Sequence, residues 1–382
     1  IDKEYYFHKA KYKESAQENQ DEDKYKGHQF IKLIESNLTT FFKDRTVESG
    51  VRKAFKGNWG ASIGTKKIGV VQDLNRLSWN SFISQLRKIN LPLASTAKVV
   101  GPRHLHASQW GYIDPVDTPD GGNIGLHKHL SIMTRITSGF SAKPLLFWLR
   151  NNTNIKLLCE STCKEMANMS KILVNGRWIG VIDTPIELLQ LLKLYRRNGI
   201  IPLYTSISFD YKSKEVIIFT DSGRLIRPLF YVDEMGKSTD KADLVKKLET
   251  NSYSWIDIVS GTKTKSLSFD PYKNAIYEVT DLFPHLSKRD SGAIKELHAS
   301  KSIVEFIDTS EENNALIATD LMSENESSQT THIEIDPSLI FGVMGNSIVY
   351  PEFNQFPRDV FSCGQSKQAV SMYHSNYQNR FD

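Results

Sequence analysis

The stretch from 101 to 127 constrains this chain more than any other feature of its sequence, because proline and glycine recur through it. Pro115 and Pro119 each fix one backbone angle and lack an N–H donor, so neither a long helix nor a central strand is expected to cross them. Stiff turns are predicted instead. At 382 residues the chain exceeds the roughly 250–300 residues that one core usually serves. Two to four domains are therefore expected.

Regular structure is predicted to resume after this stretch. Apolar runs on either side of Asn175-Gly176 predict a β-hairpin over 171–181, because this dipeptide favours a two-residue turn. The sequence Thr184-Pro185-Ile186-Glu187 resembles a capping box with proline at the first helical position. It predicts a helix that ends at Asn198-Gly199.

Two further strands are expected, at 216–219 and 225–230, and residues 140–235 are predicted to form a small α+β module. Apolar residues at helical spacing predict an amphipathic helix over 74–89, and an apolar run predicts a strand at 347–350. The expected fold class is α+β and multidomain, with mixed helices and small antiparallel sheets.

Positive charge is concentrated in one part of the chain. Residues 51–150 contain 14 basic and 4 acidic residues, whereas the whole chain has a formal net charge of +4. Such a concentration is typical of a surface that binds a polyanion, since each neutralised phosphate releases condensed counterions. The alternative is a lysine-rich face that contacts only solvent, and charge alone does not separate the two.

No stretch approaches the ~18 consecutive apolar residues that a membrane span needs. The first thirty residues are charged and do not resemble a secretory signal. Three cysteines, Cys159, Cys163 and Cys363, cannot form a framework of disulfides, which fits a reducing compartment. The sequence therefore predicts a protein that is not secreted and has no membrane partner.

Residues 60–67, GASIGTKK, superficially resemble a phosphate-binding P-loop. The spacing is one residue short, however, and Thr65 precedes the lysine instead of following it. The favoured interpretation is a flexible basic loop beside a nucleic-acid backbone, with Lys66 and Lys67 as contacts.

Asp114, Asp117 and Asp120 are spaced three apart in DPVDTPDGGN, and clustered carboxylates suit hard cations. A calcium loop needs a spacing of two, so a rigid, hydrogen-bonded turn is favoured over a metal site. The pairs His104/His106 and His127/His129 offer four nitrogens for zinc, but histidines in a polar loop usually hold no metal. No metal ligand is predicted.

A polar cluster follows the expected strand at 347–350. It contains Asn354, Gln355 and Arg358, and then Lys367 and Gln368. Arginine with amide side chains suits the binding of phosphates and sugar hydroxyls. The alternative is a polar surface helix and loop.

The run PRHLHASQWGYIDPVDTPDGGNIGL, residues 102–126, closely resembles the signature of the second-largest, beta-type subunit of multisubunit DNA-directed RNA polymerases. Further blocks agree in order, among them NGRWIG at 175–180, FTDSGRLIRPLF at 219–230 and YPEFNQFPRDVFSCGQSKQAV at 350–370. Ordered matches over most of the chain make the resemblance specific. The HKH that closely follows Gly125 and the wording DTPDGGN are more similar to the subunits of large DNA viruses than to cellular ones.

The resemblance implies a division of the chain into four parts. Residues 1–139 correspond to the fork region, domain 3 of the family's subunit. Residues 140–235 and 236–310 correspond to external domains 1 and 2, which are domains 4 and 5. Residues 311–382 correspond to the start of the hybrid-binding domain, domain 6.

The resemblance also implies roles for individual residues. Arg358 matches the arginine that approaches the triphosphate of the incoming nucleotide, and is the catalytic candidate. Gln355, Lys367 and Gln368 match positions that line the RNA 3′ end, and Asp120 matches an acidic residue that supports the active centre. Basic residues of the fork region are the candidates for contact with nucleic acid: Lys66, Lys67, Arg87, Lys88, Lys98 and Arg103.

The implied function is DNA-templated RNA synthesis by nucleotidyl transfer from NTPs, with this chain lining the active centre and the RNA–DNA hybrid channel. The implied partners are the largest polymerase subunit, other polymerase subunits, template DNA, the hybrid and NTPs. No cofactor is expected on this segment, since the family holds Mg²⁺ mainly on the largest subunit, and the isolated segment is not expected to be active. The implied location is the nucleus, or the viral factory or virion for a viral enzyme. The alternative function is a non-catalytic nucleic-acid-binding or subunit-docking module that retains the fold.

Overall fold

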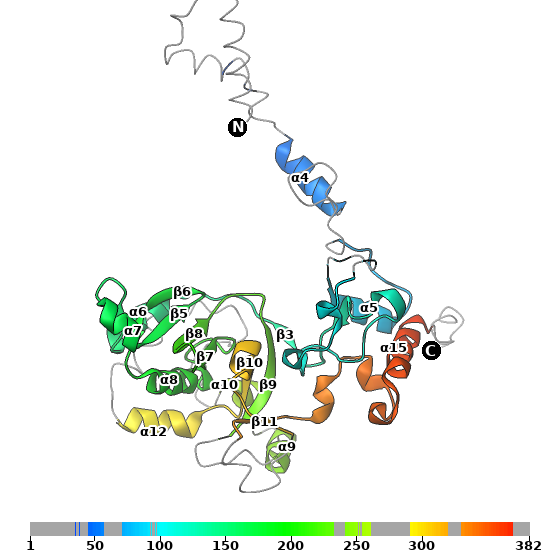
Figure 1. Cartoon of the computed structure of the whole chain (residues 1–382). Helices are drawn as coiled ribbons and strands as arrows, with labels where there is room; N and C mark the ends of the chain where they lie inside the picture. The colour runs from blue at the N-terminus through cyan, green and yellow to red at the C-terminus, as the bar shows by residue number, and fades with distance from the viewer. Residues whose placement is uncertain are drawn as a thin grey trace, which may run out of the picture. The chain divides into compact units, whose positions relative to one another are not determined.

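The computed structural model describes residues 35, 38, 45–56, 71–91, 93, 96, 98–232, 241–250, 252, 254–260, 291–319 and 330–369 (Figure 1). The chain divides into two compact units, one of residues 1–74 and 90–94 and one of residues 75–89 and 95–382. The helix described in the first unit is α4 (Thr46–Phe55), which has Val47, Val51 and Phe55 on its exposed surface. Among the described helices of both units, none has the length and apolar character that a membrane crossing needs.

The second unit contains a five-stranded sheet in the order β4-β6-β5-β8-β7. Its strands are β4 (Lys156–Leu157), β5 (Ser170–Val174), β6 (Arg177–Ile182), β7 (Ser206–Asp210) and β8 (Glu215–Phe219). Three neighbouring pairs are antiparallel, and β5 lies parallel to β8. Ile172, Val174, Val216 and Ile218 are buried while their neighbours along each strand are half-buried, which is the alternation of a sheet with one face on the core.

The hairpin predicted over 171–181 is confirmed. Strands β5 and β6 pair in antiparallel fashion around Asn175 and Gly176. Both turn residues have positive φ, 50° and 75°, as a type I′ turn requires. Asn175 also accepts a hydrogen bond from the backbone N–H of Thr220 at 2.7 Å, which ties the turn to the end of β8.

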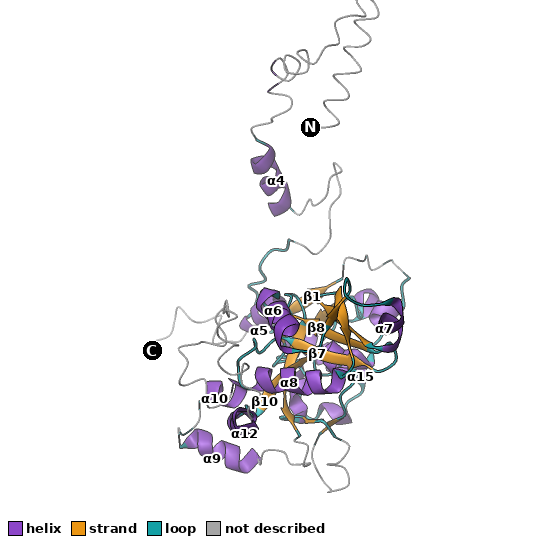
Figure 2. Ribbon diagram, turned by 90° about the vertical axis from the view of Figure 1, so that its left-hand side faces the viewer, coloured by secondary structure: helices purple, strands orange, loops and turns teal. Residues whose placement is uncertain are grey.

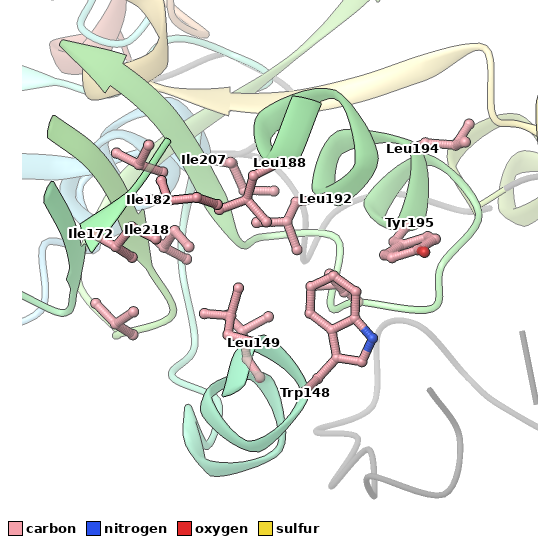
Figure 3. Packing of buried hydrophobic residues seen from close by; sticks show 14 of the residues in the cluster. Trp148, Leu149, Ile172, Ile182, Leu188, Leu192, Leu194, Tyr195, Ile207 and Ile218 are labelled. Atoms are coloured by element: carbon pink, nitrogen blue, oxygen red, sulfur yellow. The ribbon is translucent and has the colours of Figure 1, made fainter. Parts of the chain in front are cut away.

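Two helices cover this sheet, α6 (Lys143–Asn152) and α8 (Pro185–Arg197). Figure 3 shows Trp148 and Leu149 of α6 and Leu188 and Leu192 of α8 meeting the apolar side chains of the strands. Trp148 and Tyr195 contact each other edge to face, with ring centroids 5.6 Å apart. Burial of such side chains contributes roughly 1.5–3 kcal/mol each, so this core holds the helices on the sheet.

Helix α8 begins and ends where the sequence predicts, but its capping box is absent. Thr184 has φ −112° and ψ 71°, outside the extended conformation from which a cap side chain reaches the helix, and it makes no cap hydrogen bond. A capping box occurs instead in α7 (Cys163–Asn168), between Thr162 and Glu165. Proline at the first position and Gly199 with φ 67° define the limits of α8.

A second sheet has the order β10-β9-β12-β11, with β3 (Arg135–Ile136) also paired to β9. Its other strands are β9 (Leu225–Tyr231), β10 (Val304–Asp308), β11 (Ile317–Ala318) and β12 (His332–Ile333). The strands predicted at 216–219 and 225–230 are both confirmed, but they belong to different sheets. The chain changes sheet at Gly223, which has φ 86°.

Four further helices accompany these strands, α9 (Lys241–Glu249), α10 (Trp255–Ser260), α12 (Ser291–Ser300) and α13 (Thr309–Glu312). Figure 2 shows helices, strands and loops together in this part of the chain. The α+β class with small sheets is confirmed, since both kinds of element occur and each five-stranded sheet contains parallel as well as antiparallel neighbours.

The remaining elements among the described residues are α5 (Trp79–Leu86), the two-stranded sheet of β1 (Lys88–Asn90) and β2 (His127–His129), short 3₁₀ turns, and α15 (Phe356–Gln368). The helix predicted over 74–89 is shorter than expected. It begins after Ser78, whose hydroxyl caps Ser81, and it buries Ser81 and Ser84 while Leu74 and Leu77 stay exposed. The predicted strand at 347–350 is wrong, because a 3₁₀ turn occupies 345–347 and Tyr350 is left-handed with φ 50°.

Candidate functional site

The loop that contains Asp114 is built as a hydrogen-bonded turn. Asp114 is buried, and its Oδ1 accepts from the backbone N–H of Val116 at 3.0 Å and of Asp117 at 3.3 Å. Its Oδ2 accepts from the N–H of Gly342 at 2.7 Å. Burial raises the pKa of this carboxyl to about 6, although the backbone donors oppose the shift. Asp114 therefore connects residues 101–127, the proline-containing stretch, to the segment around Gly342 that precedes α15.

Arg103 and Gly125 hold the two ends of the same stretch together. The Arg103 guanidinium donates to the carbonyls of Gly122 at 2.8 Å and Ile124 at 2.9 Å. Gly125 has φ 74°, and a Cβ placed there would lie 2.4 Å from Arg103 Cα. The backbones approach so closely that only glycine fits without movement of the chain.

Helix α15 packs beside α5, as Figure 1 shows at the C-terminal end of the coloured ribbon. The hydroxyl of Ser78, the cap of α5, donates to the backbone carbonyl of Lys367 at 2.6 Å. Val360 and Cys363 of α15 are buried, and burial raises the pKa of the Cys363 thiol. This helix is thereby fixed against residues almost three hundred positions earlier in the chain.

The side chain of Lys367 joins α15 to the proline-containing stretch. Its ammonium donates to Asp117 Oδ1 at 2.6 Å and lies 3.3 Å from His129 Nε2. His129 Nδ1 lies 2.9 Å from the carbonyl oxygen of Asp117. Burial lowers the pKa of His129 to about 4, and Lys367 and Lys88 act in the same direction, so the imidazole is neutral near pH 7.

A pocket of about 480 Å³ opens where these segments meet. Its wall comes from α5, from the loop at 118–120 and from α15. Polar side chains in its lining include Asn75, Gln85, Lys88, Asp120, Gln365, Lys367 and Gln368. Two ammonium groups and several amides can bind phosphate oxygens and sugar hydroxyls.

The structure thus brings four of the predicted site residues together: Lys88, Asp120, Lys367 and Gln368. Burial and the nearby charge of Lys367 lower the pKa of Lys88. Asp120 is exposed and precedes the 3₁₀ turn Gly121–Asn123. Lys367 and Gln368 come from one part of the sequence and Lys88 and Asp120 from two others, so their meeting depends on the tertiary fold.

Arg358 and Gln355 lie at the other end of α15 and do not line this pocket. Gln355 is the N-cap residue, Arg358 stands in the first turn, and both are exposed. Nine residues separate Arg358 from Lys367, which corresponds to about 13 Å along the axis and half a turn around it. The two cations therefore point to opposite sides of the helix.

The basic candidates of the fork region differ in their surroundings. Arg87 donates to the carbonyls of Ser131, Ile132 and Thr134, and Arg103 binds its own loop as described above. Lys98 is exposed. The predicted contacts at Lys66 and Lys67 lie outside the described residues. Internal hydrogen bonds therefore occupy Arg87 and Arg103, whereas Lys98 faces solvent.

Within the described ranges, no three His, Cys, Asp or Glu side chains are placed to hold a metal ion. His104 and His106 are exposed, whereas His129 is buried beside Asp117. Cys159 and Cys163 are exposed and unpaired. The four histidines of the two His-x-His pairs thus do not form a common site.

Sequence reasoning missed the contacts of Asp117 and His129 with Lys367, which lines this pocket. The sequence favours a rigid turn for Asp117 and offers His129 only as one of four histidines that could bind zinc, but in the fold both contact Lys367. Ser78, Asn75 and Gln85 were also missed, because short polar residues around an amphipathic helix carry no distinct signal. The available signal was the position of Asp117 between two prolines, where a carboxylate is held rigidly.

Two family models match this chain. The model of RNA polymerase Rpb2, domain 3, matches residues 72–136, and the model of RNA polymerase Rpb2, domain 4, matches residues 172–233. The first match contains α5 and the proline-containing stretch, and the second contains most of the first sheet together with β9.

Curated relatives extend the similarity over most of the chain. DNA-directed RNA polymerase II subunit 2 of Arabidopsis thaliana is 34% identical over 361 residues, which are 91% of this chain and 27% of that protein. The subunit RPB2 of Meyerozyma guilliermondii is 31% identical, covering 91% of this chain and 29% of that protein. DNA-directed RNA polymerase subunit 2 of Acanthamoeba polyphaga mimivirus is 29% identical, covering 91% and 28%. The chain therefore spans less than a third of the length of these relatives.

Proposed function

This chain belongs to the family of second-largest subunits of DNA-directed RNA polymerases, and we propose that it forms part of the active-centre wall and hybrid channel of such an enzyme. The proposed reaction is DNA-templated RNA synthesis. The RNA 3′ hydroxyl attacks the α-phosphorus of an NTP, a new phosphodiester bond forms, and the bond to pyrophosphate breaks. Mg²⁺ would stabilise the attacking and leaving oxygens, and we place it mainly on the largest subunit.

The observation that carries this proposal is the pocket between α5, the loop at 118–120 and α15. Three segments from distant parts of the sequence place Lys88, Asp120 and the pair Lys367 and Gln368 around one space. A phosphate needs cations or N–H donors, and a ribose needs amides or carboxylates, and the pocket offers both kinds of group. We therefore assign Lys367 and Gln368 to the RNA 3′ end, with Asp120 as support of the active centre.

Arg358 has a separate role in this proposal, because it lies at the opposite end of α15 from Lys367 and Gln368. Arg358 is exposed in the first turn, where the helix dipole disfavours a cation. A bound triphosphate would compensate this unfavourable position and accept a bidentate contact. We assign Arg358 to the triphosphate of the incoming NTP, and Gln355, at the same end of α15, to the RNA 3′ end as the resemblance implies.

The other assignments follow from the family. We propose the division into a fork region (1–139), two external domains (140–235 and 236–310) and the start of the hybrid-binding domain (311–382). The proposed contacts of Lys66, Lys67 and Lys98 are with nucleic acid. We place the enzyme in the nucleus, or in a viral factory or virion if its source is viral.

The test is RNA extension by the enzyme assembled from the full-length subunit and its partner subunits. A preformed RNA–DNA scaffold and NTPs are supplied, and the wild-type assembly is expected to extend the RNA in a DNA-dependent reaction. The Lys88→Ala and Gln368→Ala variants are expected to extend it more slowly. Lys212→Ala is the control, since Lys212 is exposed in the turn between β7 and β8. An assembly that binds the scaffold without extending the RNA would favour a non-catalytic docking module.

A further inference from the structure

The ammonium of Lys367 is held by two acceptors that are almost completely buried. Asp117 Oδ1 is 2.6 Å and His129 Nε2 is 3.3 Å from its nitrogen, and the side chains of Asp117 and His129 are 3% and 6% exposed. The Lys367 side chain keeps 22% of its surface exposed and lines the pocket. One side of the Lys367 ammonium therefore contacts Asp117 and His129, and the other side faces the pocket.

The hydrogen bonds define how the imidazole of His129 is protonated. The carbonyl oxygen of Asp117 can only accept, so Nδ1 carries the proton and donates to it at 2.9 Å. Nε2 is then an acceptor, and the ammonium of Lys367 is its donor. A protonated imidazole would place two cations 3.3 Å apart, which the burial of His129 also opposes.

The backbone of Lys367 is fixed as well. Ser78 donates to its carbonyl oxygen from the start of α5, and the side chain is held from the proline-containing stretch. A free lysine side chain loses conformational entropy when it is ordered, and this loss opposes ligand binding. Here the fold supplies the ordering before any ligand binds, which is how preorganisation increases binding and rate.

We propose that Asp117 and His129 are positioning residues for Lys367, and that together they aim one remaining N–H of its ammonium at a phosphate or ribose oxygen of the RNA 3′ end. This inference rests on the proposed function for the identity of the ligand. An ammonium has three N–H donors, and in the part of the chain that the structure describes two of them are used by Asp117 and His129. In this proposal both residues act through the ammonium of Lys367.

The first test needs no polymerase activity. The amine of Lys367 is labelled with an acylating reagent in the full chain and quantified by mass spectrometry, with Lys212 as the internal reference. His129→Leu removes the acceptor and is expected to raise the labelling rate of Lys367 roughly tenfold, as expected for loss of a hydrogen bond to a charged group. His129→Gln retains an amide oxygen and is expected to stay near the wild-type rate. Equal Lys367 rates in all three proteins would overturn the proposal.

The second test uses the assembled enzyme. His129→Leu and Asp117→Asn are expected to lower kcat for single-nucleotide addition about tenfold or more with little change in KM for the NTP, because Lys367 is assigned to the RNA end. His129→Gln is expected to restore most of the rate. If the Leu variant assembles and keeps the wild-type kcat, the positioning role is wrong. If the wild-type assembly does not extend RNA at all, the proposed function fails, while the labelling result still decides the positioning of Lys367.

Discussion

Arg196 of α8 forms a two-pronged ion pair with Glu311 of α13, and both side chains are 1% exposed. The same guanidinium donates to Glu305 at 3.2 Å and to the carbonyl of Thr205 at 2.7 Å. Glu311 in turn accepts from the backbone N–H of Ile207 at 2.8 Å. Arg196 lies more than a hundred positions before Glu305 and Glu311 in the sequence. The network therefore joins the first sheet and its helices to the second sheet.

We predict that Arg196→Met destabilises the chain by about 3–5 kcal/mol, because it leaves Glu311 buried without its main charge partner. Arg150→Met is the matched control, since Arg150 lies 3.9 Å from Glu160 with both side chains more than half exposed. An exposed pair of this kind contributes roughly 0–1 kcal/mol. The measurement is the free energy of unfolding in denaturant. A loss for Arg196→Met no larger than that of the control would contradict the prediction.

We predict that Gly125→Ala costs more stability than Gly176→Ala. Both glycines have positive φ, 74° and 75°, so both substitutions carry the backbone strain of about 1 kcal/mol. Only Gly125 faces a backbone, with Arg103 Cα 2.4 Å from the added Cβ, whereas nothing lies within 4 Å at Gly176. Thermal unfolding of the two variants measures the difference. Equal midpoints would show that the loop at 103 moves aside without cost.

We predict that His129 makes the chain less stable as the pH falls from about 6.5 to 4, while Asp114, whose folded pKa burial raises to about 6, acts in the opposite direction. Burial lowers the folded pKa of His129 from 6.5 to about 4, so the unfolded state binds a proton in this range that the folded state does not. The full contribution of His129 to the free energy of unfolding is about 3 kcal/mol. It is present above pH 6.5, decreases as the pH falls through this range and is absent below pH 4.

His129→Gln is expected to reduce this part of the pH dependence, because the amide does not titrate. His104→Gln is the control, since His104 is exposed. Unfolding free energies at pH 4.5 and 7 give the comparison. A slope for His129→Gln equal to that of the wild type would mean that other groups cause the acid loss.

Local features of this fold could be predicted from the sequence, and distant contacts could not. The hairpin around Asn175 and Gly176 and the end of α8 at Gly199 depend on backbone preferences of a few adjacent residues. By contrast, helical spacing predicted a helix that starts at 74 with Leu74 and Leu77 on its apolar face, whereas α5 begins only at Trp79 and buries Ser81 and Ser84, and the two leucines stay exposed before it. Which face of a short helix is buried depends on its neighbour, and the neighbour is almost three hundred positions away.

The candidate site shows the same limit. The residue types around the pocket were found from the resemblance, but the contact between Lys367 and Asp117 spans 250 positions. Nothing near either residue indicates the other. A carboxylate in a polar turn suits a metal, a helix cap or a lysine equally well, and only the packing of α15 against the proline-containing stretch selects the lysine.

The last prediction concerns Arg358, whose guanidinium has no hydrogen-bond partner among the described residues and is exposed in the first turn of α15. Its removal is therefore expected to change stability by less than about 0.5 kcal/mol. A guanidinium stays protonated near neutral pH and can bind two phosphate oxygens at once, so it can offset the charge that develops on the leaving pyrophosphate. Loss of one such preorganised donor typically slows a reaction ~10²- to 10³-fold.

We expect Arg358→Ala to slow single-nucleotide addition by about that factor in the assembled enzyme, with hybrid binding almost unchanged. Arg358→Lys should fall in between, because lysine keeps the charge but cannot make the two-pronged contact. Addition rates are measured at saturating NTP on a preformed RNA–DNA scaffold, with Lys212→Ala as control. If Arg358 only stabilised its own loop, the alanine variant would unfold earlier or fail to assemble. A well-assembled Arg358→Ala enzyme that adds nucleotides at the wild-type rate would rule out its assignment to the triphosphate.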